Sequence, residues 1–319
     1  MSELLSETIV YGCRLKDHAK LMTSSSGGAF TALSDIFLQS GDAVVCSTYN
    51  YDTHQQEFRI ITTTEERDAA KGSKYFQSVP GTIFREAGKW LEDHPDKKLL
   101  FVGMGCQTAG FRSYIEQTGK RNRVVLVDII CHGSPSPMLW KEYASVIEKK
   151  NGKIEHLTFK DKRKGWKWPT AVVKAGGKEV SIREYVKVFS GRYDLRPSCH
   201  KCPYAAIERK SDITIGDFWH IEDKIPDRYD KRGTSLILIH TEKGKEVFEK
   251  AKENLIWFES NARDCWQLNL ERPTAVSVNR KQFWEDYHKY GAEYVIKKYG
   301  HVSRLSKLKK NMKRVLLHK

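Results

Sequence analysis

The chain has 319 residues, of which 39% are hydrophobic and 30% charged, with 9 Pro and 22 Gly, and this composition excludes disordered, collagen-like and low-complexity proteins. No run approaches the roughly 20 apolar residues of a membrane-spanning helix. The first ten residues lack the basic and apolar segments of a signal peptide, so we expect a cytoplasmic protein. The formal net charge is +15, but residues 301–319 carry much of the excess, which weakens a nucleic-acid-binding function.

Helix and strand patterns alternate in the first half of the chain. Apolar residues at helical spacing predict a helix over 26–39, and short apolar runs predict strands over 42–48 and 57–63. The pattern continues with a helix over 81–93, a strand over 98–103, a helix over 108–117, a strand over 123–130 and a helix over 138–149. Such alternation is typical of a parallel sheet with covering helices.

The second half has more strand patterns. We predict strands over 154–160, 168–174, 178–183, 212–215, 235–240 and 255–258, a hairpin turn at Gly176-Gly177, and helices over 242–253 and 262–270. We therefore expect a mixed α/β (α+β) fold, with a parallel or mixed sheet in the first half. Three segments are predicted: 1–104, 105–272 and a basic helical tail over 273–319.

The seven cysteines form two groups. Their odd number in a chain without a signal peptide argues against a disulfide framework. Cys13, Cys46 and Cys265 are predicted to be small buried core residues. The others lie in turn-like segments beside Gly or Pro, which is typical of metal or redox cysteines: Cys106, Cys131, Cys199 and Cys202.

Two of these cysteines follow neighbouring strand patterns. Cys106 follows the strand over 98–103, and Cys131 follows the strand over 123–130. If the two strands are parallel neighbours, both sulfurs lie at the carboxyl edge of the sheet, where α/β proteins bind ligands.

Two small-residue loops are candidate anion sites. Residues 24–28 (Ser-Ser-Ser-Gly-Gly) precede a helix, whose N-terminal amides can bind a phosphate, although an ordinary helix cap explains them equally well. Neither a P-loop nor a G-x-G-x-x-G motif is present. Residues 71–75 (Lys-Gly-Ser-Lys-Tyr) form a second loop suited to a phosphate or a flavin ring, or a solvated turn.

Taken together and in order, several segments resemble the beta-subunit family of coenzyme F420 hydrogenases and dehydrogenases. The resemblance covers roughly residues 20–270, and the matching segments are 25–28, 72–75, Cys106-Gln107, 131–137, 165–166, 196–202 and 211–219. It implies an oxidoreductase that passes electrons between a [4Fe–4S] cluster, FAD and a deazaflavin or other hydride or electron acceptor.

The resemblance also implies roles for individual residues. Segment 1–104 would bind flavin, and segment 105–272 would hold the cluster and the substrate. The cluster ligands would be Cys106, Cys131, Cys199 and Cys202. The FAD-binding residues would be Ser24, Ser25, Ser26, Gly27, Gly28, Lys71, Gly72, Ser73, Lys74 and Tyr75.

Further residues are candidates for catalysis. Gln107 and His132 would donate hydrogen bonds near the flavin or a sulfur, or simply cap the adjacent helices. Lys160, Arg163 and Trp166 would line the pocket of an anionic acceptor, with the acceptor stacked near Trp166; otherwise they form a solvated basic loop with one packed Trp. Asp217 is expected to bind backbone donors in a turn.

The chain departs from the family pattern. It lacks a ferredoxin-like run of cysteines, so we expect electrons to come from a separate ferredoxin-like protein or another donor. Gly105 and His220 replace the family's usual Pro and Gly, which leaves open whether the acceptor is F420-like or a substrate of a surface-polysaccharide pathway. A structural zinc protein and an inactive scaffold subunit of the same fold are the alternatives.

The tail has an amphipathic pattern. Apolar residues fall on one helical face, with basic residues around them: Leu305, Leu308, Met312, Val315 and Leu316. Such a helix binds an anionic membrane surface or a partner, or packs on its own domain.

Overall fold

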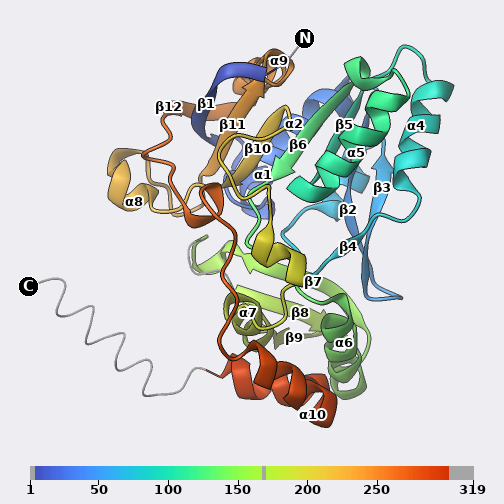
Figure 1. Cartoon of the computed structure of the whole chain (residues 1–319), viewed down its shortest axis with the longest axis vertical. Helices are drawn as coiled ribbons and strands as arrows, with labels where there is room; N and C mark the ends of the chain where they lie inside the picture. Colours follow the sequence, from blue (N-terminus) through green and yellow to red (C-terminus); the bar gives the residue numbers. More distant parts are fainter. Residues whose placement is uncertain (1–3, 167–169, 302–319) are drawn as a thin grey trace, which may run out of the picture.

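A computed structural model describes residues 4–166 and 170–301. Its main element is a nine-stranded mixed sheet with strand order β12-β1-β11-β10-β6-β5-β2-β3-β4 (Figure 1). The strands are β1 (Leu4–Leu15), β2 (Ala43–Asn50), β3 (Gln55–Ile61), β4 (Ser78–Val79), β5 (Leu99–Met104), β6 (Val124–Ile129), β10 (Ile213–Asp217), β11 (Ser235–Thr241) and β12 (Leu255–Ser260).

The centre of this sheet is parallel. Strands β2, β5, β6 and β10 run in one direction, while β11, β1 and β12 form an antiparallel extension on one side. On the other side, β3 pairs antiparallel with β2. The carboxyl ends of the four parallel strands therefore meet at one edge of the sheet.

Helices cover both faces of the sheet. Val44 and Leu100 belong to a core with α2 (Ala29–Gln39) and α9 (Glu242–Ala251), next to α1 (His18–Thr23) and α3 (Thr64–Ala70). The neighbouring strand residues Val45 and Phe101 belong to a second core with α4 (Ile83–Asp93) and α5 (Gly105–Gln117). Because successive side chains of a strand point to opposite faces, these two cores lie on opposite sides of the sheet.

A smaller lobe packs below the carboxyl edge in the view of Figure 1. Its antiparallel sheet contains β7 (Ile154–Asp161), β8 (Thr170–Ala175) and β9 (Lys178–Ser181). The helices α6 (Pro137–Asn151), α7 (Arg183–Ser190) and α10 (Arg280–Gly300) complete a separate aromatic-rich core. Helix α10 is interrupted at Gly291, where φ is 79°. Within the described residues, no helix combines the length and apolar character needed to cross a bilayer.

The predicted mixed α/β fold is confirmed, and most predicted elements lie within a few residues of the observed ones. The boundary predicted at residue 104 falls between β5 and α5, and the large sheet takes strands from both sides of it. The amphipathic helix predicted in the tail lies outside the described residues, apart from His301.

Other predictions were wrong. Residues 262–270 form turns and a short 3-10 helix rather than an α-helix, because Asn261 accepts from the Asp264 amide and holds a local turn. The long strand β1 was missed, and the end of the strand predicted over 178–183 belongs to the start of α7.

Candidate functional site

The four turn cysteines line one cavity of about 350 Å³. Strands β5 and β6 are parallel neighbours, as predicted, with Met104 opposite Ile129 at their carboxyl ends. Cys106 lies in the first turn of α5 rather than in a loop, and Cys131 follows β6 by two residues. Cys199 lies in a 3-10 helix over Pro197–Lys201, which Cys202 follows. The chain thus brings four thiols to one side of the sheet edge.

The thiols affect one another electrostatically. Burial, with a smaller contribution from the neighbouring Cys202 and Cys199, raises the pKa of Cys106. Burial likewise raises the pKa of Cys131 to about 12. Backbone amides donate to two of the sulfurs: Gly133 to Cys131 at 3.4 Å and Ser134 to Cys199 at 3.3 Å. These donors would stabilise thiolate charge.

The arrangement of the described cysteines bears on which metal group they suit. Among the residues that the structure describes, no three His, Cys, Asp or Glu side chains are close enough to hold a single metal ion. Four sulfurs at about 2.3 Å from one zinc ion would lie within roughly 4 Å of each other. In a [4Fe–4S] cluster each thiolate binds a different iron, so the sulfurs are spaced more widely.

The remaining cysteines are buried in the cores, as predicted. Cys13 and Cys265 have no exposed surface, and Cys46 is 4% exposed. Burial raises the pKa of Cys13 to about 12 and that of Cys265 to about 11, so neither is an activated thiol.

A larger cavity of about 1230 Å³ runs along the carboxyl edge of the parallel strands, between the sheet and the smaller lobe. Both predicted cofactor loops line it, through Ser24, Ser25, Ser26, Gly28 and residues 71–75. The loops meet where the hydroxyls of Ser25 and Ser73 lie 3.0 Å apart. Residues that are 48 positions apart in the chain therefore form a continuous wall.

The start of α2 offers fewer free amides than we expected. The amides of Gly27 and Ala29 donate to the Ser235 hydroxyl at 2.9 and 3.3 Å, and the Gly28 amide donates to the Ser25 carbonyl at 3.0 Å. Gly27 does not line the cavity, and a Cβ there would lie 2.1 Å from the Cys13 carbonyl oxygen. Gly27 thus allows close packing against β1, and because the amides already have partners, the loop hydroxyls are the groups left to meet a phosphate.

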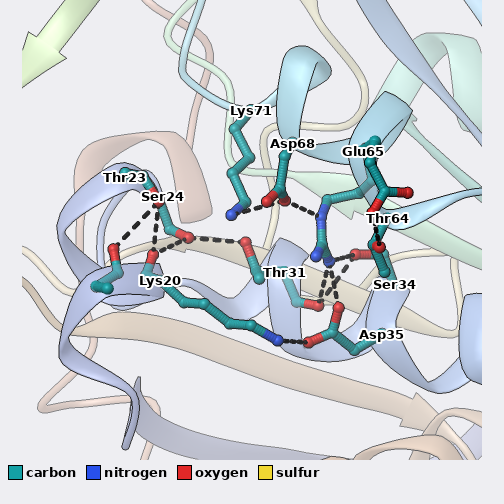
Figure 2. A network of polar contacts seen from close by, with 12 residues as sticks. Lys20, Thr23, Ser24, Thr31, Ser34, Asp35, Thr64, Glu65, Asp68 and Lys71 are labelled. Carbon is teal, nitrogen blue, oxygen red and sulfur yellow. Dashed lines mark hydrogen bonds and ion pairs between the residues drawn. The ribbon is translucent and has the colours of Figure 1, made fainter.

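A buried polar network holds the two loops in place (Figure 2). Arg67, which is 1% exposed, donates to the Asp35 carboxylate at 2.6 Å and the Ser34 hydroxyl at 2.8 Å. It also contacts Asp68, which pairs with Lys71 at 2.7 Å. The hydroxyls of Ser24 and Thr31, on the other side, lie 2.7 Å apart. Helices α2 and α3 are thereby joined beneath the cavity.

Lysines supply positive charge to the larger cavity. Lys74 lines it and donates to the carbonyls of Ala70 at 2.7 Å and Gly72 at 3.1 Å, and burial lowers its pKa to about 8. Lys160 also lines the cavity and pairs with Asp217 at the end of β10. Burial opposes the charge of Lys160, but the Asp217 carboxylate outweighs it and raises the Lys160 pKa. Asp217 is therefore an ion-pair partner rather than a turn residue.

Two of the predicted acceptor residues line neither cavity. Trp166 is 2% exposed and packs against Trp219 with ring centroids 5.0 Å apart. The Arg163 side chain is 54% exposed and pairs with Asp161 and Glu179. We therefore withdraw the acceptor roles of Trp166 and Arg163. Trp219, which sequence reasoning did not select, lines the cavity instead.

The two cavities share a wall. The residues that line both are Met104, Gln107, Cys131, His132, Gly133, Ser134 and Asn269. The Gln107 side chain accepts from the Met104 amide at 3.1 Å and donates to the Ser78 hydroxyl at 2.8 Å, so it caps its own helix as the alternative interpretation held. His132 Nε2 and the Ser134 hydroxyl are buried without a hydrogen-bond partner among the described residues.

The sequence analysis also missed polar residues deeper in the larger cavity. Ser47 and Gln56 line it, and within the described part of the chain the Ser47 hydroxyl and Gln56 Oε1 are buried with no hydrogen-bond partner. The sequence shows polar residues alternating with apolar ones along β2 and β3, but nothing in this pattern indicated a ligand. Together with His132 Nε2, these orphaned atoms fit a cofactor with polar ring edges, and the four thiols fit an iron–sulfur cluster.

Comparisons with known proteins show the family and the fold to which this chain is similar. The coenzyme F420 hydrogenase/dehydrogenase beta-subunit family is described by two models, of which the N-terminal one matches residues 10–82 and the C-terminal one matches residues 96–263. A chain of the F420-reducing [NiFe] hydrogenase complex from Methanosarcina barkeri, solved after xenon derivatization, has a similar fold. The two structures superpose with a TM-score of 0.53 and share 18% sequence identity. The match covers 92% of this chain and 89% of the Methanosarcina chain. No curated protein sequence matches significantly.

Proposed function

The chain belongs to the coenzyme F420 hydrogenase/dehydrogenase beta-subunit family, and on that premise we propose that it passes electrons between a [4Fe–4S] cluster, FAD and an anionic acceptor. The observation that carries this proposal is the wall shared by the cysteine cavity and the larger cavity. Groups bound on its two sides would be separated only by residues such as Gln107 and His132.

The cysteine cavity supports an iron–sulfur cluster better than zinc. Its four thiols match the ligand number of a [4Fe–4S] cluster, and they do not converge as single-ion ligands do. The amides of Gly133 and Ser134, which donate to Cys131 and Cys199, would raise the potential of a cluster held there. Such hydrogen bonds to sulfur are a known means of tuning cluster potentials.

The larger cavity supports a flavin dinucleotide. Its volume of about 1230 Å³ exceeds that of the pockets that bind most small ligands, and the Ser25–Ser73 contact places hydroxyls from both loops together. The cluster would supply single electrons and the flavin a hydride when both are bound. This chain's residues would bind and orient the cofactor and exclude water from it.

The mouth of the same cavity supports an anionic acceptor. Lys160, Lys164, Arg183 and Lys187 line it, and Trp219 lies there beneath Lys160, whose Nζ is 5.3 Å from the ring centroid. Positive charge beside an aromatic surface suits a negatively charged heterocycle. The related Methanosarcina protein is part of a hydrogenase complex, and we propose that a separate donor protein likewise supplies electrons here.

Anaerobic purification tests the proposal. We expect about four irons and one releasable FAD per chain, with absorbance that dithionite bleaches. The double variant Cys199→Ser/Cys202→Ser should lose the iron, whereas Cys265→Ser, a buried cysteine outside both cavities, should retain it. Stoichiometric zinc without iron or flavin would instead support the structural zinc alternative. Absence of metal and flavin after reconstitution would support an inactive scaffold.

A further inference from the structure

One end of the larger cavity lies against the β2–β3 hairpin and contains polar atoms that the protein leaves unpaired. Gln56 is 9% exposed, and its Oε1 has no hydrogen-bond partner in the residues that the structure describes. The buried Ser47 hydroxyl also has no partner among them. Both residues line the cavity. An unpaired buried polar group costs about 1–3 kcal/mol, so two at one end of a cavity indicate groups that a ligand satisfies.

These atoms belong to one surface. In the antiparallel register Ser47 lies opposite Phe58, and Gln56 is two residues from Phe58 along β3. Side chains at these positions share one face of the hairpin. We call Ser47, Gln56 and Phe58 the hairpin pocket. An aromatic wall with a hydroxyl and an amide beside it suits the polar edge of a flat ring.

The hairpin pocket adjoins the wall of the cysteine cavity. Gln56 lies opposite Ser78 in the sheet, and the Ser78 hydroxyl accepts from Gln107, which lines both cavities. The Cβ position that Gly103 lacks would be 3.4 Å from both the Phe58 ring and Gln107 Cβ. Phe58 and Gln107 therefore both lie next to Gly103.

We propose that the hairpin pocket binds the imide edge of the flavin ring, its carbonyl–NH–carbonyl side, and not the adenine of the dinucleotide. The inference rests on the proposed function, since the ring that exchanges electrons must lie near the cysteine cavity. The Gln56 carbonyl would accept from the ring N–H, and the Ser47 hydroxyl would donate to a ring carbonyl.

Lys74 adds a second reason to prefer the imide edge. It lines the same cavity, and no carboxylate pairs with it in the described part of the chain. Its charge acts on the Cys46 thiol, which lies on the opposite face of β2 from Ser47. Two-electron reduction puts negative charge on the imide side of a flavin, which an ammonium lining the same cavity favours. Neutral adenine would gain nothing from this charge.

Binding of three flavins tests the assignment. Riboflavin, FMN and FAD are titrated into the anaerobically prepared full chain and its Gln56→Leu variant, with flavin fluorescence as the readout. Loss of the amide should weaken the binding of all three flavins by the same factor, about tenfold. Gln55→Leu, on the opposite face of β3, is the matched control and should leave the affinity for each flavin unchanged. If only FAD binding is weakened, adenine occupies the pocket and the proposal is overturned. Unchanged binding of all three flavins would also overturn it.

The redox potential of the bound flavin gives an independent readout. The Lys74→Met variant should have a more negative flavin potential, because a positive charge is lost. The Lys74→Arg variant keeps the charge, so its flavin potential should stay close to that of the wild type. An unchanged potential in Lys74→Met would overturn the placement of the imide edge near Lys74. Equal iron content and melting temperature show that the variants fold. If the wild-type chain binds no flavin, the proposed function fails; if only Gln56→Leu lacks effect, this assignment alone fails.

Discussion

Replacing Arg67 with Met should destabilise the protein strongly, although the residue is far from the cysteines. The Arg67 guanidinium is buried between α2 and α3, where it pairs with Asp35 at 2.6 Å and with Asp68 (Figure 2). Methionine has a similar length and keeps most of the apolar packing. The substitution therefore removes mainly the charge and its hydrogen bonds.

The structure gives the size of the effect. Removing one partner of a buried ion pair costs about 3–5 kcal/mol, because the other charge stays buried without compensation. The Asp35 side chain is 3% exposed but keeps one cation, Lys20, at 3.0 Å. We therefore expect the lower value, about 3 kcal/mol. With a denaturant slope of roughly 3 kcal/mol/M, the urea midpoint should fall by about 1 M.

Urea unfolding followed by circular dichroism measures this shift. Adding Asp35→Asn to Arg67→Met removes the carboxylate that Lys20 alone compensates only partly, so the double variant should recover about 1–2 kcal/mol. Arg59→Met is the control: its side chain is 61% exposed and 3.9 Å from Glu57, so it should cost less than about 0.5 kcal/mol. A double variant no more stable than Arg67→Met would refute the explanation by buried charge.

Three further predictions follow from other buried groups. Burial lowers the pKa of Lys162, whose ammonium donates to the Leu21 carbonyl, from 10.5 to about 7. Between pH 7 and 10.5 the unfolded chain therefore binds more protons than the folded one, so the free energy of unfolding should rise with pH. Urea midpoints measured over this range should rise less for Lys162→Met than for the wild type. Trp166→Phe should lower the melting temperature and leave flavin binding unchanged, whereas Trp219→Ala should mainly weaken acceptor binding in titrations. Gly27→Ala should prevent soluble expression, because its Cβ would overlap backbone, while Gly72→Ala, with open space around it, should give soluble protein of slightly lower melting temperature.

Much of the fold could be predicted from local patterns. Apolar runs and turn residues identified the parallel strands β2, β5, β6 and β10, because buried parallel strands are continuously apolar, and they identified α4, α5 and α6 between these strands but not α3 and α7. Strand β1 was missed because it contains Ser6, Glu7 and Arg14 among its apolar residues. Its place between β11 and β12 depends on pairing partners that are distant in the sequence.

The sequence by itself determined which residues are candidates for cofactor binding. Cysteines beside Gly and Pro, and small-residue loops before helices, have local signatures that do not depend on long-range contacts. The prediction that Cys106 and Cys131 share one sheet edge also held, since alternating strands and helices imply parallel neighbours.

Only the tertiary structure decided which of these residues face a cavity. It placed Trp166 in the core and Trp219 at the cavity, although both belong to similar Gly- and aromatic-containing segments. It also showed that the Gly27 and Ala29 amides are already bound by Ser235, and that Gln56 Oε1 is left without a partner. Hydrogen-bond partners distant in sequence settle these questions, because whether a polar atom is free for a ligand depends on everything packed around it.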